Sequence, residues 1–356
     1  MIRCVDLFCG LGGLTHGLIK GGVRVVAGVD VDPQCQFPYE TNNDARFIKR
    51  DVRELCGRTL RDLWKGATYT LLAGCAPCQP FSTYSRNGRK SRRDAMWNLV
   101  GDFGRLVREA HPDLVTMENV PQLLDHNVFV DFLSSLEGYH TWYEVVECAR
   151  FGVPQTRKRL VLLASRLGPI SLAHSVKDDE NEVATVRAAI SHLPPLVAGQ
   201  VHPNDKLHSA CKLSLLNLER IRASKQGGTW RDWEPALIAK CHLKTSGTTY
   251  PSVYGRMEWD APAPTITTQC FGYGNGRFGH PQQDRAITLR EAAILQTFPD
   301  SYQFLRDDER LRFHVLGRLI GNAVPVRLGE VLAQSLLKHV RRLTKQSARR
   351  RSRSRH

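Results

Sequence analysis

The first 165 residues alternate between short apolar runs and segments with helical periodicity, and this alternation restricts the fold more than any other feature. Strands that alternate with helices form a mostly parallel sheet covered on both faces. The sequence therefore predicts a doubly wound α/β domain. The expected strands are Ile2–Phe8, Val23–Val31, Arg46–Asp51, Tyr69–Ala73, Asp113–Met117, Tyr143–Cys148 and Leu160–Ala164. The expected helices are Leu14–Lys20, Phe129–Leu136 and an apolar stripe at Met96, Leu99, Val100, Phe103, Leu106 and Val107.

After Ser165 the periodic runs give way to a segment rich in Gly, Pro, Thr, His and Lys that extends to about residue 284. We interpret this segment as a second, smaller domain. It contains an aromatic and basic stretch at Lys225–Trp233 and a donor-rich loop at His242–Tyr250. A protein that reads a DNA groove needs such donors and flat aromatic faces. The alternative is a plain irregular insertion with a solvated surface.

The formal charge of +15, from 50 Lys and Arg against 35 Asp and Glu, points to a polyanionic partner. Part of the excess is local, because the segment from Arg341 to His356 carries eight Lys and Arg residues and no acid. Residues from Lys345 onward lack apolar periodicity, so we expect a disordered arm that attracts phosphates without reading sequence. A merely solubilising end is the alternative.

The cysteines and the hydropathy indicate the compartment. The ten cysteines are scattered singly through apolar segments apart from one C-x-x-C pair, as in a protein with reduced thiols. No stretch approaches the length of about 18 apolar residues that a membrane span requires, and the first residues read as a strand. We expect a cytoplasmic protein that associates with a bacterial nucleoid.

The turn Gly74–Ser82 follows an apolar strand and presents a thiol, Cys78, on a backbone stiffened by prolines. Glu118 follows another apolar strand, and parallel sheets gather their sites at the carboxyl ends of their strands. We expect a nucleophile and an acid to converge there. The alternative is that Cys75 and Cys78 form a redox dithiol or half of a zinc site. No second C-x-x-C follows, so we expect no metal.

Three glycines between the first strand and the first helix, in Asp6–Gly13, indicate a loop that passes close to a ligand. Thr15 stands where the dinucleotide fingerprint has its last glycine, so NAD is not the expected cofactor. Asp30 ends the second strand, where a carboxylate can accept from ribose hydroxyls. Asp51 closes the third strand and can accept from an adenine amino group.

Taken together, these motifs resemble the DNA (cytosine-5)-methyltransferases over nearly the whole chain. The motifs that carry the resemblance occur in the family's order: Asp6–Gly13, Asp30, Asp51, Pro77-Cys78-Gln79 with Phe81-Ser82, Glu118-Asn119-Val120, Gln155–Arg159, Thr288–Ala293 with Leu295–Pro299, and Gly321–Pro325. The resemblance implies a class I, Rossmann-like methyltransferase sheet with one reversed strand and a smaller, irregular target-recognition domain. It implies a catalytic domain at 1–165, target recognition at 166–284, a return to the catalytic domain at 285–344, and the basic tail at 345–356.

The same resemblance implies S-adenosylmethionine as cofactor and double-stranded DNA as substrate. It makes Cys78 the nucleophile, Glu118 the acid, Arg159 a ligand of the ring oxygen, and Arg157 a holder of the loop or the carboxylate. It assigns cofactor binding to Phe8, Gly10, Leu11, Gly12, Gly13, Asp30, Val31, Asp51, Val52, Pro77, Asn322 and Val324. We expect a monomer, working beside a cognate restriction endonuclease without a stable complex.

Three positions depart from the family pattern. The family usually has Glu followed by a bulky aromatic residue where this chain has Asp30 and Val31, so other apolar groups such as Phe8 or Val52 are expected to hold the adenine. Cys75 stands where an apolar residue is common, and we expect it to be structural. The competing interpretations are a tRNA cytosine-5 methyltransferase, a non-catalytic DNA-binding relative and an NAD oxidoreductase.

Overall fold

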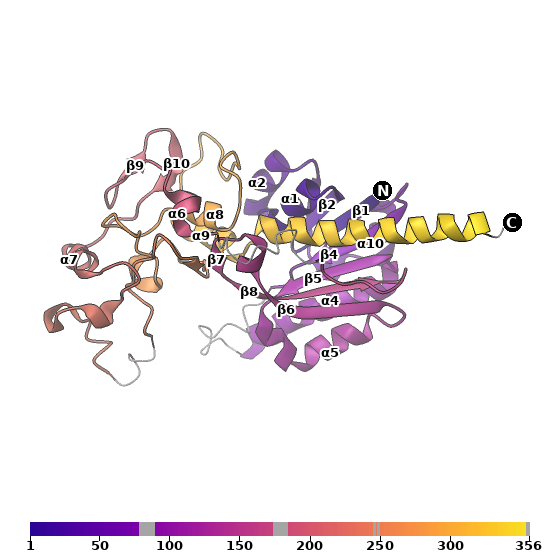
Figure 1. Ribbon diagram of the computed structural model, residues 1–356, viewed down its shortest axis with the longest axis horizontal. Helices are drawn as coiled ribbons and strands as arrows, with labels where there is room; N and C mark the ends of the chain where they lie inside the picture. The colour runs from indigo at the N-terminus through magenta and orange to yellow at the C-terminus, as the bar shows by residue number, and fades with distance from the viewer. Residues whose placement is uncertain (78–89, 174–183, 245–246, 248–249, 354–356) are drawn as a thin grey trace. The chain divides into compact units, whose positions relative to one another are not determined.

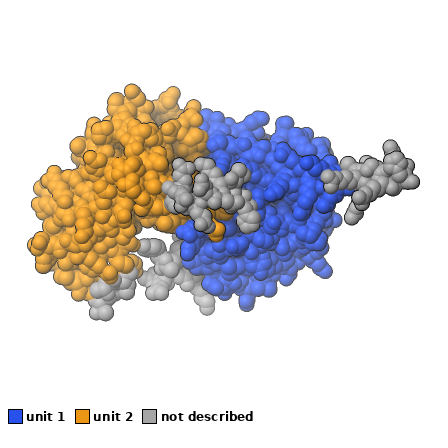
Figure 2. Space-filling view, in the orientation of Figure 1, with its two compact units in different colours: residues 1–147, 158–178, 324–356 blue, residues 148–157, 179–323 orange. Residues whose placement is uncertain are grey.

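The computed structural model describes residues 1–77, 90–173, 184–244, 247 and 250–353, with backbone only at 90–97 and 347–353. The chain divides into two compact units (Figure 2). Unit 1 comprises Met1–Glu147, Lys158–Asp178 and Val324–His356, and unit 2 comprises Cys148–Arg157 and Asp179–Ala323.

Unit 1 is built on a seven-stranded sheet with the order β3-β2-β1-β4-β5-β8-β6 (Figure 1). All neighbouring strands pair in parallel except β8, which is antiparallel to both β5 and β6 and is therefore the one reversed strand. The strands are β1 (Ile2–Leu7), β2 (Arg24–Asp30), β3 (Arg46–Lys49), β4 (Tyr69–Gly74), β5 (Leu114–Asn119), β6 (His140–Glu147) and β8 (Lys158–Ser165).

Helices cover both faces of this sheet because alternate residues of each strand point to opposite sides. In β1, Val5 and Leu7 pack into a hydrophobic core with α3, α4 and α5. Asp6, between them, faces α1 and accepts a hydrogen bond from Thr15. The helices of unit 1 are α1 (Gly13–Lys20), α2 (Gln36–Asn42), α3 (Gly57–Leu63), α4 (Lys90–Ala110), α5 (Asn127–Ser134) and α10 (Val326–Arg353).

The predicted doubly wound α/β fold is confirmed, with every expected strand present to within a few residues. Helices α2 and α3 were not predicted, because each is only seven residues long. The structure also differs at the tail, where α10 continues to Arg353 instead of becoming disordered at Lys345. Lys, Gln, Ala and Arg are strong helix formers, and a helix propagates easily from a packed segment. No helix among the described residues is long and apolar enough to cross a membrane.

Unit 2 consists of short elements joined by long irregular connections. Its α-helices and strands are β7 (Gln155–Thr156), α6 (Val186–Ile190), β9 (Val201–His202), β10 (Asp205–Ser209), α7 (Leu215–Ala223), β11 (Ala263–Pro264), α8 (Leu289–Leu295) and α9 (Phe313–Asn322). Two-stranded pairings join β9 with β10 and β7 with β11. A few buried aromatic and polar clusters therefore hold this unit together.

One of these clusters changes the interpretation of the stretch Lys225–Trp233. Trp230 and Trp233 are buried in a hydrophobic cluster with Tyr273. The indole nitrogen of Trp230 donates to the carbonyl of Tyr250 at 2.9 Å, and that of Trp233 donates to Ser224 Oγ at 2.8 Å. The expectation that these rings offer flat faces to a DNA groove is therefore wrong, since both are used in the core. The exposed side chains of the stretch include Lys225, Gln226 and Arg231.

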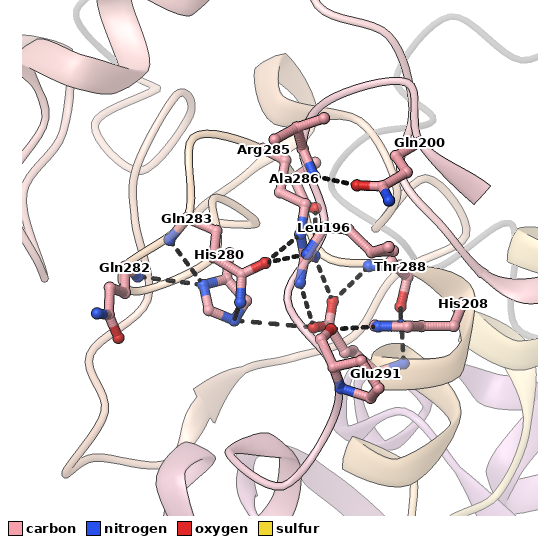
Figure 3. A network of polar contacts seen from close by, with 12 residues as sticks. Leu196, Gln200, His208, His280, Gln282, Gln283, Arg285, Ala286, Thr288 and Glu291 are labelled. Atoms are coloured by element: carbon pink, nitrogen blue, oxygen red, sulfur yellow. Dashed lines mark hydrogen bonds and ion pairs between the residues drawn. The ribbon is translucent and has the colours of Figure 1, made fainter. Parts of the chain in front are cut away.

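A buried ion pair forms the second cluster, at the start of α8 (Figure 3). Arg285 donates to both carboxylate oxygens of Glu291, at 2.8 and 2.7 Å, and both side chains are almost fully buried. Glu291 also accepts from the backbone of Thr288, whose hydroxyl caps the helix in return. The Arg285 Nε donates to Gln283 Oε1 at 2.8 Å. Every charged atom in this cluster has a partner.

The boundaries of the two units differ from the predicted domain limits of 165, 284 and 344. The segment 285–323 belongs to unit 2 rather than to the sheet-bearing unit, and so does 148–157. Gln155 explains this, because its amide nitrogen donates to Leu295 O at 2.7 Å and to Gln296 Oε1 at 2.8 Å. Such contacts join segments 140 residues apart in the sequence.

Candidate active site

The predicted site residues of unit 1 lie at the carboxyl ends of the parallel strands. Gly10 follows β1, Asp30 ends β2, Pro77 follows β4 and Glu118 lies near the end of β5. Arg159 lies near the start of β8, and because β8 is reversed its start meets the end of β5. The fold therefore gathers these residues at one edge of the sheet, where parallel α/β sheets bind their ligands.

Glu118 is the most closely surrounded of these residues. Its side chain is 2 % exposed, and Arg159 Nε lies 2.7 Å from its Oε1. In the register of the antiparallel pair, Glu118 faces Val161, so Arg159 is its diagonal neighbour on the same face. The contact is an ion pair without hydrogen-bond alignment, and Oε1 has no hydrogen-bond partner among the described residues. One carboxylate oxygen therefore keeps its capacity to bond a ligand.

The second oxygen of Glu118 has a partner that the sequence did not predict. The Cys75 thiol donates to Glu118 Oε2 with Sγ and Oε2 2.6 Å apart. Cys75 was expected to be structural, yet its sulfur contacts the predicted catalytic acid. The only signal in the sequence was its position three residues before Cys78.

The loop after β4 is tied to β5 by the next residue of the same motif. The Asn119 side-chain amide donates to the carbonyl of Ala76 at 3.1 Å, and Asn119 Oδ1 accepts from the backbone of Val120. This bond fixes the backbone one residue before Pro77. Cys78, the predicted nucleophile, lies outside the described residues. Its assignment stays a prediction, supported by the placement of the segment that leads to it.

Arg157 has surroundings quite different from those of Arg159. It belongs to unit 2, is 2 % exposed, and its guanidinium donates to three backbone carbonyls. The acceptors are Ile266 O at 3.0 Å, Gly321 O at 3.3 Å and Ala323 O at 3.2 Å. Arg157 thus fastens three segments of unit 2 together, including the start of the predicted motif Gly321–Pro325.

The glycine loop places Gly10 next to Asp30. The backbone N–H of Gly10 donates to Asp30 Oδ2 at 3.0 Å, and the backbone N–H of Asp32 donates to Asp30 Oδ1 at 2.9 Å. Gly10 and Gly12 have φ angles of +51° and +88°, which favour glycine. A Cβ at Gly10 would meet no heavy atom within 4 Å, so the loop borders open space beside the Asp30 carboxylate. Burial raises the pKa of Asp30 despite these bonds.

Beneath this loop lies a buried polar cluster that the sequence does not predict. Thr15 Oγ1 donates to Asp6 Oδ2 at 2.7 Å and lies 3.0 Å from the hydroxyl of Tyr39. Burial raises the pKa of Asp6 to about 7. Asp6 Oδ1 is buried without a hydrogen-bond partner among the described residues. Thr15, noted only as a departure from the dinucleotide fingerprint, is thus the partner of a carboxyl group below the loop.

Among the remaining predicted cofactor residues, Val31 and Phe8 are accessible, whereas Val52 is buried and Asp51 is paired with Arg53. Val31 is 58 % exposed beyond the end of β2, and Phe8, at φ +58°, is half-buried at the turn. Val52 lies in the hydrophobic core. The Asp51 carboxylate accepts from Arg53 Nε at 3.0 Å, and the guanidinium of Arg53 lowers the pKa of Asp51. A ligand at Asp51 would therefore compete with Arg53.

The other residues of that set are divided between the units. Leu11 and Gly13 are buried at the start of α1. Val324, 5 % exposed, lies two residues before α10 in unit 1. Asn322 is exposed and is the last residue of α9 in unit 2.

Three observations on unit 1 fit a nucleoside-bearing cofactor. Gly10 borders open space, Asp30 presents acceptors at that space, and the exposed Val31 offers apolar surface beside it. Hydroxyl groups of a ribose would find acceptors at Asp30. The residues present therefore fit a cofactor with a ribose and a flat base that packs on apolar surface.

Comparison with known proteins gives consistent matches. The family model described as C-5 cytosine-specific DNA methylase matches residues 2–338. The Type II methylase M.HgiDII of Herpetosiphon aurantiacus is 52% identical over 337 residues, covering 93% of this chain and 94% of that protein. The Type II methyltransferase M1.HphI of Haemophilus parahaemolyticus is 30% identical, covering 94% and 86%. A DNA modification methyltransferase encoded within an Escherichia coli prophage matches with a TM-score of 0.70 at 21% identity, covering 95% and 99%.

Proposed function

This chain belongs to the C-5 cytosine-specific DNA methylase family, and we propose that it methylates carbon 5 of a cytosine within a specific duplex sequence through a covalent Cys78 intermediate. The chain is a DNA (cytosine-5)-methyltransferase of the Type II restriction-modification type. The observation that carries the proposed mechanism is the placement of Glu118. It is buried at the sheet edge, paired with Arg159, and bonded to the segment that leads into Cys78.

The proposed mechanism first overcomes the low nucleophilicity of the carbon atom that is methylated. Carbon 5 of cytosine is a poor nucleophile, and addition of the Cys78 thiolate to carbon 6 turns the ring into an enamine. Glu118 would bond ring N3 and the exocyclic amine through Oε1, which has no hydrogen-bond partner in the described part of the chain. Arg159 would donate to the carbonyl oxygen O2 of the base. After methylation, loss of the proton from carbon 5 and elimination of the thiolate free Cys78.

The two arginines of the motif would act differently. Arg159, 13 % exposed beside Glu118, is available to the base. Arg157 would act as a positioning residue, because its guanidinium holds Ile266, Gly321 and Ala323 through their carbonyls. The predicted alternative, in which Arg157 contacts a carboxylate, has no support from these bonds.

S-adenosylmethionine is the proposed methyl donor, and it would supply an electrophilic methyl group. Gly10 and Asp30 would hold its ribose, and Val31 would cover its base. Adenosylmethionine is expected to raise the melting temperature of the protein, whereas NAD is not. A shift with NAD alone would instead favour an oxidoreductase.

Double-stranded DNA is the proposed substrate, and the cytosine must leave the stack to reach Glu118, at a cost of a few kcal/mol. We further propose that the enzyme works as a monomer, beside an endonuclease that it does not bind stably. Expression in a host without DNA methylation, followed by sequencing of methylated cytosines, would identify the recognised sequence. Methyl transfer to tRNA but not to duplex DNA would overturn the choice of substrate.

The nucleophile is tested by Cys78→Ser. This change is expected to abolish methyl transfer, because a serine hydroxyl is far less acidic than a thiol, and to leave duplex binding intact. The wild type should become covalently attached to a duplex with 5-fluorocytosine at the mapped position, and the variant should not. Normal methylation by the variant would contradict the assignment.

A further inference from the structure

The carboxyl-terminal helix α10 packs against α1, and both helices run in the same direction. A Cβ at Gly17 would meet the Val326 carbonyl oxygen and Gly329 Cα, and one at Gly21 would meet Ala333 Cβ. Later residues of α1 thus face later residues of α10. Because α1 returns from the carboxyl edge of the sheet toward its amino edge, α10 also runs toward the amino edge (Figure 1). Glu118, near the end of β5, lies at the carboxyl edge.

The second half of α10 lies at the amino edge. Its Thr344 hydroxyl is 3.4 Å from the hydroxyl of Tyr69, the first residue of β4. Its His339 Nε2 is 2.8 Å from the hydroxyl of Ser165, the last residue of the reversed strand β8. Glu118 lies near the other end of these strands. A strand of six residues is about 20 Å long, so this half of α10 and the candidate site are at opposite edges of unit 1.

This end of α10 forms a groove of about 710 Å³, and among the residues that the structure describes its charged lining residues are all basic. They are Lys338, Arg341, Arg342 and Lys345, all exposed. No acidic residue follows Glu330 in the sequence, while five more arginines follow Lys345. The described lining of the groove therefore carries a net positive charge. Leu337, the apolar residue that α10 contributes to the lining, is half-buried, and α10 shows no exposed apolar face over residues 326–346 that would insert into a membrane.

We infer that this basic groove binds the phosphate backbone of a second DNA segment, distinct from the duplex presented at Glu118. The inference rests on the proposed function, which makes duplex DNA the substrate. Phosphates match the charge, and each phosphate contact makes the slope of log affinity against log salt concentration more negative by about 0.9. DNA has a persistence length of about 150 base pairs, so the duplex at the site cannot turn back to the opposite edge. The groove thus binds either a distant segment of the same DNA or a second DNA molecule, and the enzyme bridges two segments of DNA.

A capture experiment tests this inference. A biotinylated duplex much shorter than the persistence length of about 150 base pairs is fixed on beads, and the full-length enzyme is added with a fluorescent duplex. The wild type is expected to retain the second duplex in a salt-dependent manner. The variant Arg341→Glu/Lys345→Glu is expected to retain at least fivefold less. Methyl transfer to a short duplex, measured with tritiated adenosylmethionine, should stay within twofold of wild type, because the groove is remote from Glu118.

The control variant Arg46→Glu/Arg58→Glu makes the same charge change at two exposed arginines outside the groove and should bridge like the wild type. Undiminished bridging by the groove variant would overturn the inference, and would assign bridging to a dimer or another surface. An equal loss of bridging and of methyl transfer would also overturn it, because the groove would then contact the substrate duplex. Displacement of the second duplex by RNA at concentrations where duplex DNA fails would assign the groove to RNA. Absence of methyl transfer in the wild type would instead contradict the proposed function.

Discussion

Two arginine–glutamate pairs with buried carboxylates, one in each unit, use the same side chains in opposite ways. In unit 2, Arg285 satisfies both oxygens of Glu291, and a backbone amide adds a further bond. In unit 1, Arg159 contacts one oxygen of Glu118 without hydrogen-bond alignment, and a weakly donating thiol holds the other. A saturated buried pair has no capacity left for a ligand, whereas an unsaturated one keeps it. The two pairs therefore differ in whether the carboxylate has all its hydrogen bonds: the structural pair has them, and the candidate catalytic pair does not.

The sharpest test of this comparison is Glu118→Gln. The amide keeps the shape of the carboxyl group but cannot share a proton with ring N3, so methyl transfer should fall by a factor of about 10² to 10⁴. The melting temperature should change little, because the side chain is not saturated in the fold. Methyl transfer and thermal unfolding would be measured on the same preparation.

A matched control for that substitution lies on the next strand but one. Glu144 occupies the same row of the sheet, since Glu118 and Glu144 both pair with Val161, but Glu144 is exposed. Glu144→Gln should leave methyl transfer unchanged. Equal losses in both variants would show that the row, and not the buried site, is sensitive to substitution.

The opposite outcome is expected for the saturated pair. Arg285→Met should destabilise unit 2 by about 3–5 kcal/mol, because it leaves the Glu291 carboxylate buried without its cation. The double variant Arg285→Met/Glu291→Met should regain part of this loss, since the uncompensated charge is removed. Urea unfolding measures both effects.

The exposed pair of Arg222 with Asp284 provides the reference for this test. Arg222→Met should change stability by less than about 1 kcal/mol, because exposed ion pairs contribute little. A single variant at Arg285 that is as stable as the one at Arg222 would refute the structural role of the buried pair.

The contrast between these pairs also marks the limit of what the sequence predicts. Apolar runs placed Glu118 and Asp30 at strand ends, because a run of buried residues and its polar successor are adjacent in the sequence. The partner of Glu118 was not predictable in this way. Cys75 and Glu118 are 43 residues apart, and their contact depends on the alignment of β4 with β5.

The same limit applies to the second unit and to the motif that links the units. Arg157 and Arg159 were predicted as members of one catalytic motif, yet one fastens backbone segments of unit 2 and the other contacts Glu118. Trp230 and Trp233 were expected at a DNA surface, but partners at Tyr250 and Ser224 hold them in the core. The composition of a segment shows that it contains aromatic residues, but the tertiary contacts determine which of these side chains are buried.

The two units should also respond to pH in opposite directions. Burial raises the pKa of Asp6 in unit 1 to about 7, so the folded state binds an extra proton and its stability falls as pH rises from about 4 to about 7. Burial lowers the pKa of His280 in unit 2 to about 4, so stability falls as pH drops from about 6.5 to about 4. Each pKa unit corresponds to about 1.4 kcal/mol, and the two effects partly cancel in the wild type.

Single substitutions should separate these contributions. Asp6→Asn removes the first, so its stability should rise with pH more steeply than that of the wild type across the shared window. His280→Gln removes the second, so its stability should fall with rising pH. Urea unfolding at several pH values measures both slopes. Parallel slopes in all three proteins would show that neither group titrates as its burial implies.

The smallest effect is expected at Cys75. Cys75→Ala removes the thiol that holds Glu118 Oε2, and kcat/KM should fall about fivefold, the equivalent of one hydrogen bond of about 1 kcal/mol. Cys75→Ser, whose hydroxyl can donate to the same oxygen, should recover most of this loss, whereas Cys241→Ala, at an exposed cysteine of unit 2, should cause none. If alanine and serine at position 75 lower kcat/KM equally, the thiol acts through packing alone. If Cys75→Ala lowers kcat/KM as far as Glu118→Gln does, the Glu118 carboxylate depends on the hydrogen bond from Cys75 for its entire function. Cys75, Glu118 and Arg159 would then act as one unit.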